Sequence, residues 1–232
     1  RDGGVRGTVI GLHKALNRLE STEHTVYAEA GITCAKLAKF CAKQALGDAE
    51  FFAGIPGTLG GALAMNAGCY GQETWQVVQR VLMVNRRGDL QWRTPMAFTV
   101  HYRQVEPLIA DEWFVAAELT FSSSTEAQVK QRIKTLLHTR LRQQPLDFPS
   151  AGSTFRNPPG DYAARLIEAS GLKGYTMGGA QVSPKHANFI INLGHATAHD
   201  IEKLIQHIRD MVWHHSGVLL EQEVKVMGEY EK

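Results

Sequence analysis

Three short segments contain polar residues whose types suit chemistry better than packing. They are residues 101–103 (HYR), the Gly152-Ser153 pair with Asn157 shortly after it, and Glu223 near the C-terminal end. A carboxylate in a closed site can serve as an acid or as an anchor. Ordinary alternatives stay open, because an isolated arginine is usually exposed and a serine after glycine usually belongs to a turn. No Gly-x-Ser-x-Gly elbow surrounds Ser153, so these residues alone define no reaction.

A glycine-rich stretch, residues 51–71, is the most unusual part of the sequence, and no charged side chain occurs between Glu50 and Glu73. Its glycines are Gly54, Gly57, Gly60, Gly61, Gly68 and Gly71. Glycine lets a backbone approach a ligand closely, and successive N–H groups can hold phosphate oxygens without a lysine. The stretch matches neither a Walker A loop nor G-x-G-x-x-G. It indicates a phosphate-bearing ligand, with a pair of tight turns as the alternative.

The composition is that of a globular protein without a charged partner. The chain has 232 residues, 44% of them hydrophobic and 21% charged, with a net charge of +2. This length allows one large or two small domains. The charge gives no reason to expect a nucleic acid or a membrane surface as partner. We expect no signal peptide and no membrane-spanning segment.

The cysteines and histidines predict neither disulfides nor a metal site. Three cysteines are an odd and sparse set, which is typical of a reducing compartment. Cys34 and Cys41 are seven residues apart on a predicted helix, so both should pack in the core. Cys69 has no nearby ligand partner, and the ten histidines, His13 among them, show no metal-ligand spacing.

Hydrophobic periodicity predicts mixed helices and strands, and hence an α+β fold. In the first half we expect strands at 5–12, 25–30 and 113–121, a helix at 33–46, and a hairpin formed by 77–85 and 89–93. A domain boundary is expected between residues 123 and 124. Beyond it we expect helices at 126–142, 162–170 and 198–216 and strands at 180–183, 189–193 and 218–227. Glu221, Glu223 and Lys225 would share one face of the last strand.

Five segments, which together extend over nearly the whole chain, resemble those of one protein family and occur in the same order. They are GIPGTLGGALAMNAGCYG, HYR, QPLDFPSAGSTFRNP, AARLIEASGLKGYTMGGAQVSPKHANFIIN and GVLLEQEVKVMG. This arrangement resembles the UDP-N-acetylenolpyruvoylglucosamine reductases of bacterial peptidoglycan precursor synthesis, in their shorter subtype. The resemblance implies a PCMH-type FAD-binding domain at 1–123 and a small α+β substrate domain at 124–232, whose last strand completes the active site.

The resemblance also implies roles for individual residues. Ser153 would be the proton donor, Arg103 and Glu223 the other catalytic residues, and Glu221 the less favoured of the two glutamates. Substrate binding would involve Asn157, Tyr102 and Arg103. The implied cofactor-binding residues are Gly54, Ile55, Pro56, Gly57, Thr58, Gly60, Gly61, Asn66, Ala67 and Gly68.

The implied reaction explains these residue types. Hydride passes from reduced FAD to C3 of UDP-N-acetylglucosamine enolpyruvate, and NADPH reduces the flavin beforehand. Arg103 would bind the substrate carboxylate and stabilise the developing enolate, assisted by Glu223. Ser153 would donate the proton to C2. The family further implies a monomer in the cytoplasm, with links to cell shape, cell division and the cell cycle.

One departure concerns the start of the sequence. In the family a pyrophosphate loop precedes the RDGGVRG motif, which here occupies residues 1–7. The sequence is therefore expected to begin inside a domain, and the chain by itself to bind FAD weakly or not at all. Two alternatives are a non-catalytic protein that binds a UDP-sugar and a PCMH-type flavin oxidoreductase with another substrate. The combination of Ser153, Arg103 and Glu223 favours the reductase.

Overall fold

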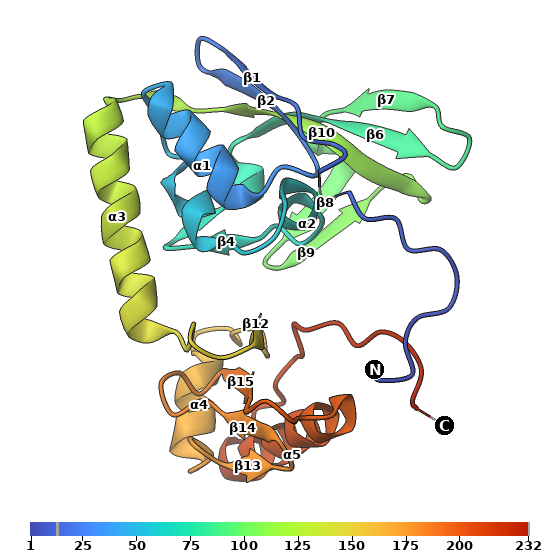
Figure 1. Cartoon of the computed structure of the whole chain (residues 1–232), viewed down its shortest axis with the longest axis vertical. Helices are drawn as coiled ribbons and strands as arrows, with labels where there is room; N and C mark the ends of the chain where they lie inside the picture. The colour runs from blue at the N-terminus through green and yellow to red at the C-terminus, as the bar shows by residue number, and fades with distance from the viewer. Residues whose placement is uncertain (13, 232) are drawn as a thin grey trace. The chain divides into compact units, whose positions relative to one another are not determined.

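The computed structural model describes residues 1–12 and 14–231 and contains two compact units (Figure 1). One unit is Ile10–Arg140, and the other combines Arg1–Val9 with Leu141–Lys232. The division between them falls inside helix α3 (Glu126–Gln143). The predicted boundary between residues 123 and 124 lies just before this helix begins.

A five-stranded antiparallel sheet forms the framework of the unit Ile10–Arg140. Its strand order is β1-β2-β10-β6-β7. The bounds are β1 Leu19–Thr22, β2 Thr25–Glu29, β6 Val78–Asn85, β7 Leu90–Arg93 and β10 Glu112–Thr120. The strands predicted at 25–30 and 113–121 and the hairpin at 77–93 are confirmed. Alternate residues of β2 are buried, as expected for a sheet with one face on the core.

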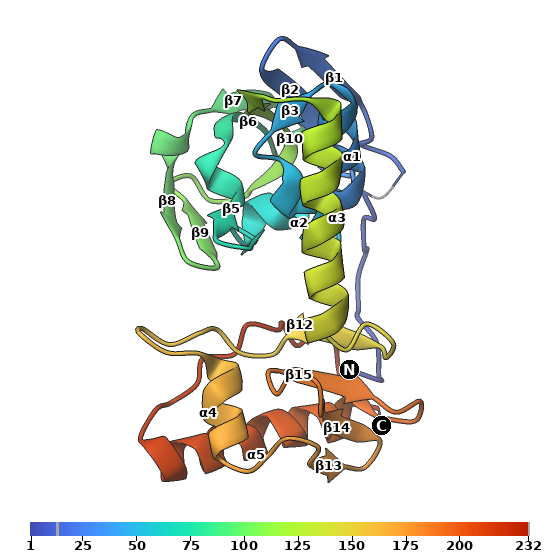
Figure 2. The ribbon, with the colours of Figure 1, turned by 90° about the vertical axis from the view of Figure 1, so that its left-hand side faces the viewer.

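Helix α2 (Leu59–Ala64) packs against this sheet, and helix α1 (Cys34–Lys43) contributes its buried face to the same hydrophobic core (Figure 2). The hydroxyl of Thr33 accepts a hydrogen bond from the N–H of Lys36 at 3.2 Å and so caps α1. Cys34 and Cys41 are completely buried with the apolar face of α1, which confirms their predicted place in the core. Short strands β3 (Leu46–Gly47) and β11 (Ser122–Ser123) pair beside α1.

The glycine-rich stretch is more regular than a loop. It contains a 3₁₀ turn at Glu50–Gly54, all of α2 and strand β4 (Gly68–Cys69), which pairs with β5 (Gln72–Glu73). Another 3₁₀ turn, Thr74–Gln76, follows β5. Beyond the turn at Pro95–Ala97, strands β8 (Phe98–His101) and β9 (Gln104–Pro107) form a hairpin. Arg103 lies at its tip.

Residues 5–12 do not form the predicted strand. They have no regular structure, and Val9 and Ile10 are 75% and 78% exposed. A β-type pattern becomes a strand only where a neighbouring strand takes up its backbone hydrogen bonds. Within the described chain no strand pairs with this segment, so the prediction is wrong.

The unit that contains Leu141–Lys232 is built on a four-stranded antiparallel sheet of order β12-β15-β14-β13. The bounds are β12 Ser150–Ser153, β13 Thr176–Met177, β14 Ala180–Val182 and β15 Phe189–Asn192. Helices α4 (Ala163–Ala169) and α5 (Ala198–Ser216) supply the rest of its core. A capping box of Thr197 and Asp200 begins α5, and Gly217 ends it with φ 70°.

The predicted last strand at 218–227 is absent from the described residues. Among the described residues, this segment has a single isolated bridge, between Gln222 and Phe155, and Phe155 follows β12. The prediction that Glu221, Glu223 and Lys225 share a strand face is therefore wrong. The segment is fixed instead by backbone hydrogen bonds to residues that follow β12.

The buried side chain of Asn188 fixes the backbone that follows β12. Its Oδ1 accepts a hydrogen bond from the N–H of Phe155 at 2.9 Å, and its Nδ2 donates to the Phe155 carbonyl at 2.8 Å. The carbonyl of Asn188 accepts a third bond, from Thr154 N at 2.8 Å. One side chain thus satisfies both backbone polar groups of a buried residue.

We predict that Asn188→Ala lowers the free energy of unfolding of this unit by about 2–4 kcal/mol, because the buried N–H and C=O of Phe155 lose their partners. Asn17→Ala is the matched control, since Asn17 is exposed and bonds only a nearby carbonyl. Its effect should stay within about 0.5 kcal/mol. Urea denaturation of the variants measures both values, and equal losses would contradict the role of Asn188.

Candidate active site

Arg103 contacts the backbone of the glycine-rich stretch. Its Nη2 donates to the carbonyl of Gly68 at 2.8 Å and its Nη1 to the carbonyl of Asn66 at 3.3 Å. A carboxylate oxygen of Glu73 lies 3.7 Å from Nη1, and the guanidinium lies 4.7 Å from the ring centre of Tyr102. The structure therefore brings together two candidate segments that are far apart in the sequence, residues 102–103 and residues 66–68.

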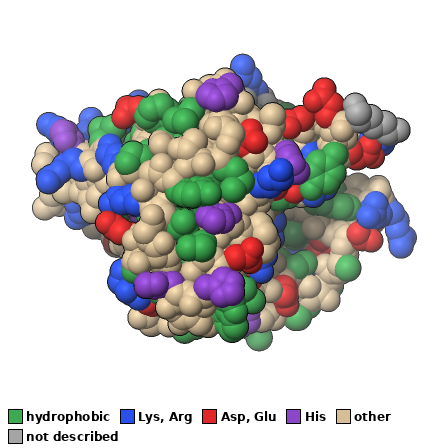
Figure 3. Space-filling model, turned by 90° about the horizontal axis from the view of Figure 1, so that it is seen from below, with side chains coloured by type: hydrophobic (Ala, Val, Ile, Leu, Met, Phe, Trp, Pro, Cys, Tyr) green, Lys and Arg blue, Asp and Glu red, His purple; other side chains and the backbone are tan. Residues whose placement is uncertain are grey.

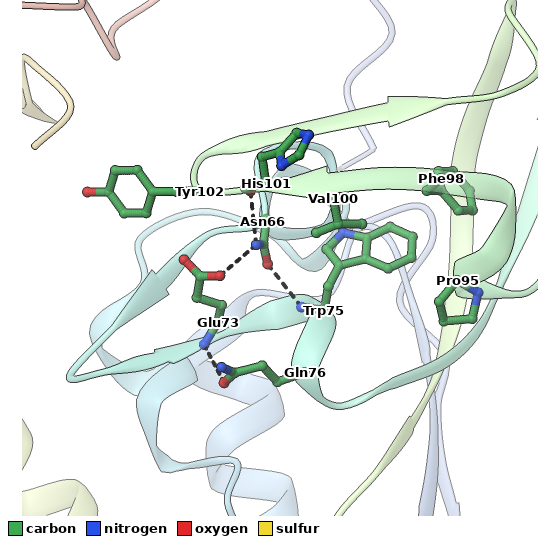
Figure 4. A pocket seen from close by; sticks show the side chains of 9 residues that line it. All are labelled: Asn66, Glu73, Trp75, Gln76, Pro95, Phe98, Val100, His101 and Tyr102. Carbon is green, nitrogen blue, oxygen red and sulfur yellow. Dashed lines mark hydrogen bonds between the residues drawn. The ribbon is translucent and has the colours of Figure 1, made fainter. Parts of the chain in front are cut away.

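Asn66 is the centre of a hydrogen-bond network in this part of the unit (Figure 4). Its side chain is buried, and its Nδ2 donates to Glu73 Oε2 at 2.8 Å and to the His101 carbonyl at 3.2 Å. Its Oδ1 accepts the backbone N–H of Trp75 at 3.1 Å. The amide predicted to contact the cofactor thus binds three neighbouring parts of the protein. These bonds hold the backbone at residues 66–68 in place.

The backbone around this network adopts an uncommon conformation at three non-glycine residues. Asn66, Tyr70 and Arg103 have φ values of 42°, 56° and 57°, in the left-handed region. Asparagine tolerates this region better than most residues, whereas tyrosine and arginine do not. The hydroxyl of Tyr70 is anchored on α3 through a 2.7 Å hydrogen bond to the carbonyl of Leu136.

A cavity of about 450 Å³ opens beside the network. Figure 4 shows its lining residues, which are Asn66, Glu73, Trp75, Gln76, Pro95, Phe98, Val100, His101 and Tyr102. Sequence reasoning did not single out six of these lining residues, namely Glu73, Trp75, Gln76, Pro95, Phe98 and Val100. A local signal was present, because Glu73 and Gln76 form a capping box around the turn at Thr74–Gln76.

Part of the glycine-rich stretch forms an open backbone surface. Pro56, Gly57 and Gly61 are exposed, and a Cβ added at Gly57 or at Gly61 would meet no atom within 4 Å. Gly57 has φ 93°, which favours glycine. A surface without side chains lets a flat ligand approach the backbone closely. These residues therefore fit the wall of a cofactor site.

Other predicted cofactor residues are occupied by packing or by internal hydrogen bonds. The N–H groups of Leu59 and Gly60 bond the carbonyls of Ile32 and Ala30 at 2.8 and 2.9 Å, so neither group is directed at a phosphate. A Cβ at Gly54 would lie 2.5 Å from the sulfur of Cys69. Ile55 is buried, while Thr58 and Ala67 are half-buried.

Ser153 and Glu223 belong to segments that are directly bonded to each other. The N–H of Glu223 donates to the carbonyl of Thr154 at 2.8 Å, and the N–H of Arg156 donates to the carbonyl of Glu221 at 2.8 Å. The carboxylate of Glu221 forms an ion pair with Arg156 at 2.7 Å. This pairing commits Glu221 to an internal contact with Arg156.

Asn157 has a structural contact at the beginning of α4. Its Oδ1 accepts the backbone N–H of Ala163, the first residue of that helix, at 3.1 Å. The first N–H groups of a helix have no partner within the helix, so this bond stabilises its N-terminal end. Asn157 therefore orders the loop that follows Ser153, whatever its contact with a ligand.

In the described part of the chain, the thiols and histidines show no sign of a reactive or metal-binding cluster. Burial raises the pKa of Cys34 and Cys41 to about 12 and that of Cys69 to about 11, so all three remain protonated thiols at neutral pH. Histidines are visible at the surface in Figure 3. Among residues 1–12 and 14–231, no three metal-ligating side chains are grouped to hold an ion. His13 lies outside the described residues.

No helix in the described part of the chain combines the length and the apolar character needed to span a membrane.

Two family models match the chain, in the order that the fold suggests. The model of an FAD binding domain matches residues 1–93. The model described as UDP-N-acetylenolpyruvoylglucosamine reductase, C-terminal domain, matches residues 144–227. The first match contains the glycine-rich stretch, and the second contains Ser153, Asn157 and Glu223.

Individual relatives agree with these matches. The UDP-N-acetylenolpyruvoylglucosamine reductase of Methylococcus capsulatus is 57% identical over 99% of this chain and 75% of its own length. That of Alkalilimnicola ehrlichii is 55% identical over 99% of this chain and 76% of its own. The crystal structure of the corresponding reductase from Thermus caldophilus has a TM-score of 0.77 at 30% identity, and covers 87% of this chain and 72% of that one. The chain therefore belongs to the UDP-N-acetylenolpyruvoylglucosamine reductase family.

Proposed function

We propose that this chain reduces UDP-N-acetylglucosamine enolpyruvate to UDP-N-acetylmuramate in peptidoglycan precursor synthesis, with FAD as cofactor and NADPH as reductant. It is an FAD-dependent oxidoreductase that acts on a CH–CH group. The proposal depends above all on the position of Arg103, a predicted substrate-binding residue, against the carbonyls of Asn66 and Gly68. An anion-binding guanidinium is thereby held on the wall assigned to the flavin.

FAD, when bound, supplies hydride to the substrate carbon. The exposed backbone at Gly57 and Gly61 is where we propose that it rests. Arg103 binds the substrate carboxylate and stabilises the negative charge that develops on it. Carbonyl oxygens and the ring of Tyr102 orient this guanidinium. Little reorganisation is then required when charge develops.

We assign proton transfer to the segments joined by the Thr154–Glu223 hydrogen bond. Ser153 donates its hydroxyl proton to C2 of the substrate, which is carbanion-like at that stage and therefore a strong base. Glu223, in its protonated form, stabilises the enolic form of the carboxylate. Asn188 and Asn157 hold the backbone that follows Ser153 and so help to fix the position of its hydroxyl.

The domain assignment and the cellular setting belong to the same proposal. We assign flavin binding to residues 1–123 and substrate binding to residues 124–232, supported by family matches at 1–93 and 144–227. A cytoplasmic monomer that contributes to cell shape, cell division and the cell cycle fits a precursor-synthesis enzyme. Gel filtration with light scattering tests the monomer.

We predict that Ser153→Ala lowers the rate of substrate reduction by about 10²–10⁴-fold, because the proton donor is lost. Reduction of the flavin by NADPH should continue at the wild-type rate, since that step uses no serine proton. Stopped-flow absorbance of the flavin resolves the two half-reactions. An equal loss in both would refute the proposed role of Ser153.

Glu223→Gln and Glu221→Gln form a matched pair that tests the choice between the two glutamates. We predict a loss of about 10²-fold in kcat for substrate reduction with the Glu223 variant, because an acid that contacts the reacting group is removed. The Glu221 variant loses an ion pair whose carboxylate is exposed to solvent, and it should keep kcat within about twofold. Reversed losses would transfer the role to Glu221.

Substitutions at Gly61 test the proposed flavin wall. Gly61 lies inside α2, so Gly61→Ala should raise the free energy of unfolding by about 0.5–1 kcal/mol. Gly61→Leu should keep the fold but raise the dissociation constant of FAD at least about tenfold, because its side chain fills the open space. Flavin fluorescence titration measures the affinity. Unchanged FAD affinity in Gly61→Leu would remove this residue from the site.

A further inference from the structure

The carboxylate of Glu73 touches three elements that meet at the proposed site. Its Oε2 accepts a hydrogen bond from Asn66 Nδ2 at 2.8 Å, and its Oε1 lies 3.7 Å from Nη1 of Arg103. The same side chain accepts the N–H of Gln76, whose own side chain caps the backbone of Glu73. Figure 4 shows Glu73 pointing toward Asn66 beside the cavity.

The geometry of the Glu73–Arg103 pair differs from that of a purely structural ion pair. In the same unit, Arg93 and Glu112 form two hydrogen bonds, of 2.7 and 3.2 Å, and neither side chain is more than 17% exposed. That arrangement is bidentate, and each charge is neutralised by the other. The 3.7 Å separation of Glu73 from Arg103 lies outside hydrogen-bond range. At this distance the carboxylate of Glu73 attracts and orients the guanidinium of Arg103 without a hydrogen bond between the two.

The backbone is shaped to place Glu73 there. Gly68 pairs with Glu73 across the β4–β5 hairpin, and a Cβ at Gly68 would lie 3.0 Å from the Cα and Cγ of Glu73. The carbonyl of Gly68 also accepts the hydrogen bond from Arg103 Nη2. The glycine thus lets the strand that binds Arg103 approach the residue that orients it.

We infer that Glu73 is a positioning residue, whose carboxylate holds the guanidinium of Arg103 and the amide of Asn66 so that Arg103 is presented to an anionic group of the substrate. The inference rests on the proposed function for the identity of that group. Glu73 acts through Arg103 and touches no reacting atom. Its removal should therefore change substrate binding and leave the reduction of flavin by NADPH intact.

The test compares Glu73→Gln with Glu112→Gln in the full chain. Both changes remove the negative charge of an arginine partner and keep the size of the side chain. We expect Glu73→Gln to raise KM for the substrate and the dissociation constant of UDP-N-acetylmuramate, measured by calorimetry, about tenfold. Its flavin reduction by NADPH should stay within about twofold of wild type. Glu112→Gln should leave all of these values within about twofold.

A double-mutant cycle with Arg103→Ala decides whether Glu73 acts through Arg103. If it does, Glu73→Gln has no further effect on product binding once the guanidinium is gone, and Glu73→Asp restores part of the affinity in the wild-type background. Additive losses, or a Glu73→Gln protein that binds the product as tightly as Glu112→Gln does, would overturn the inference.

A third measurement needs neither activity nor ligand. The side-chain Nε–H resonance of Arg103 in ¹⁵N-arginine spectra, assigned with the Arg103→Ala variant, should move in Glu73→Gln and stay in place in Glu112→Gln. An unmoved resonance in Glu73→Gln rejects the positioning role. A wild-type chain that neither binds the product nor reduces the substrate rejects the proposed function, and the Arg103 resonance then still decides the role of Glu73.

Discussion

The arrangement of the candidate site depends on one buried amide. Asn66 cannot be desolvated without partners, because an unpaired buried polar group costs roughly 1–3 kcal/mol. Its three hydrogen bonds join the end of the glycine-rich stretch to β5, to the turn after β5 and to the β8–β9 hairpin. The position of the backbone at Asn66 therefore determines the positions of β5, of the turn after it and of the β8–β9 hairpin. Arg103 is then bonded to carbonyls whose positions the amide has already fixed.

The glycines of the stretch 51–71 serve two different physical purposes. Gly54, Gly60 and Gly68 allow protein parts to touch, since a Cβ at each would collide with or press on a neighbour. Gly57 and Gly61 face open space and leave the backbone accessible. Glycine thus allows close packing on the protein side of the stretch and leaves the backbone accessible on the exposed side. This combination explains how a neutral stretch can be rigid and still have a surface that admits a ligand.

The sequence predicts those helices and strands whose signals are local. The prediction fails for segments whose secondary structure depends on a partner far away in the sequence. The helix at 198–216 has its own cap residues, its own apolar stripe and a terminal glycine, and it is found with the predicted bounds. The segments at 5–12 and 218–227 have strand-like patterns, but strands require neighbours, which sequence periodicity does not identify. Residue type singled out Arg103 and Ser153 as candidates, and a family resemblance implied their roles. Glu73 was missed because a charged residue at the end of a neutral stretch is usually exposed to solvent.

The left-handed backbone at Asn66, Tyr70 and Arg103 is concentrated around the proposed substrate arginine. Each such residue carries conformational strain, of order 1 kcal/mol or more outside glycine. Substitution by glycine would relieve that strain at the cost of the side chain. At Asn66 the three side-chain hydrogen bonds outweigh this strain, so stability alone retains the asparagine. At Arg103 selection for thermal stability alone would favour glycine, whereas selection for turnover retains the arginine. Divergent copies that have lost the enzymatic role should therefore acquire glycine at Arg103 before they do so at Asn66.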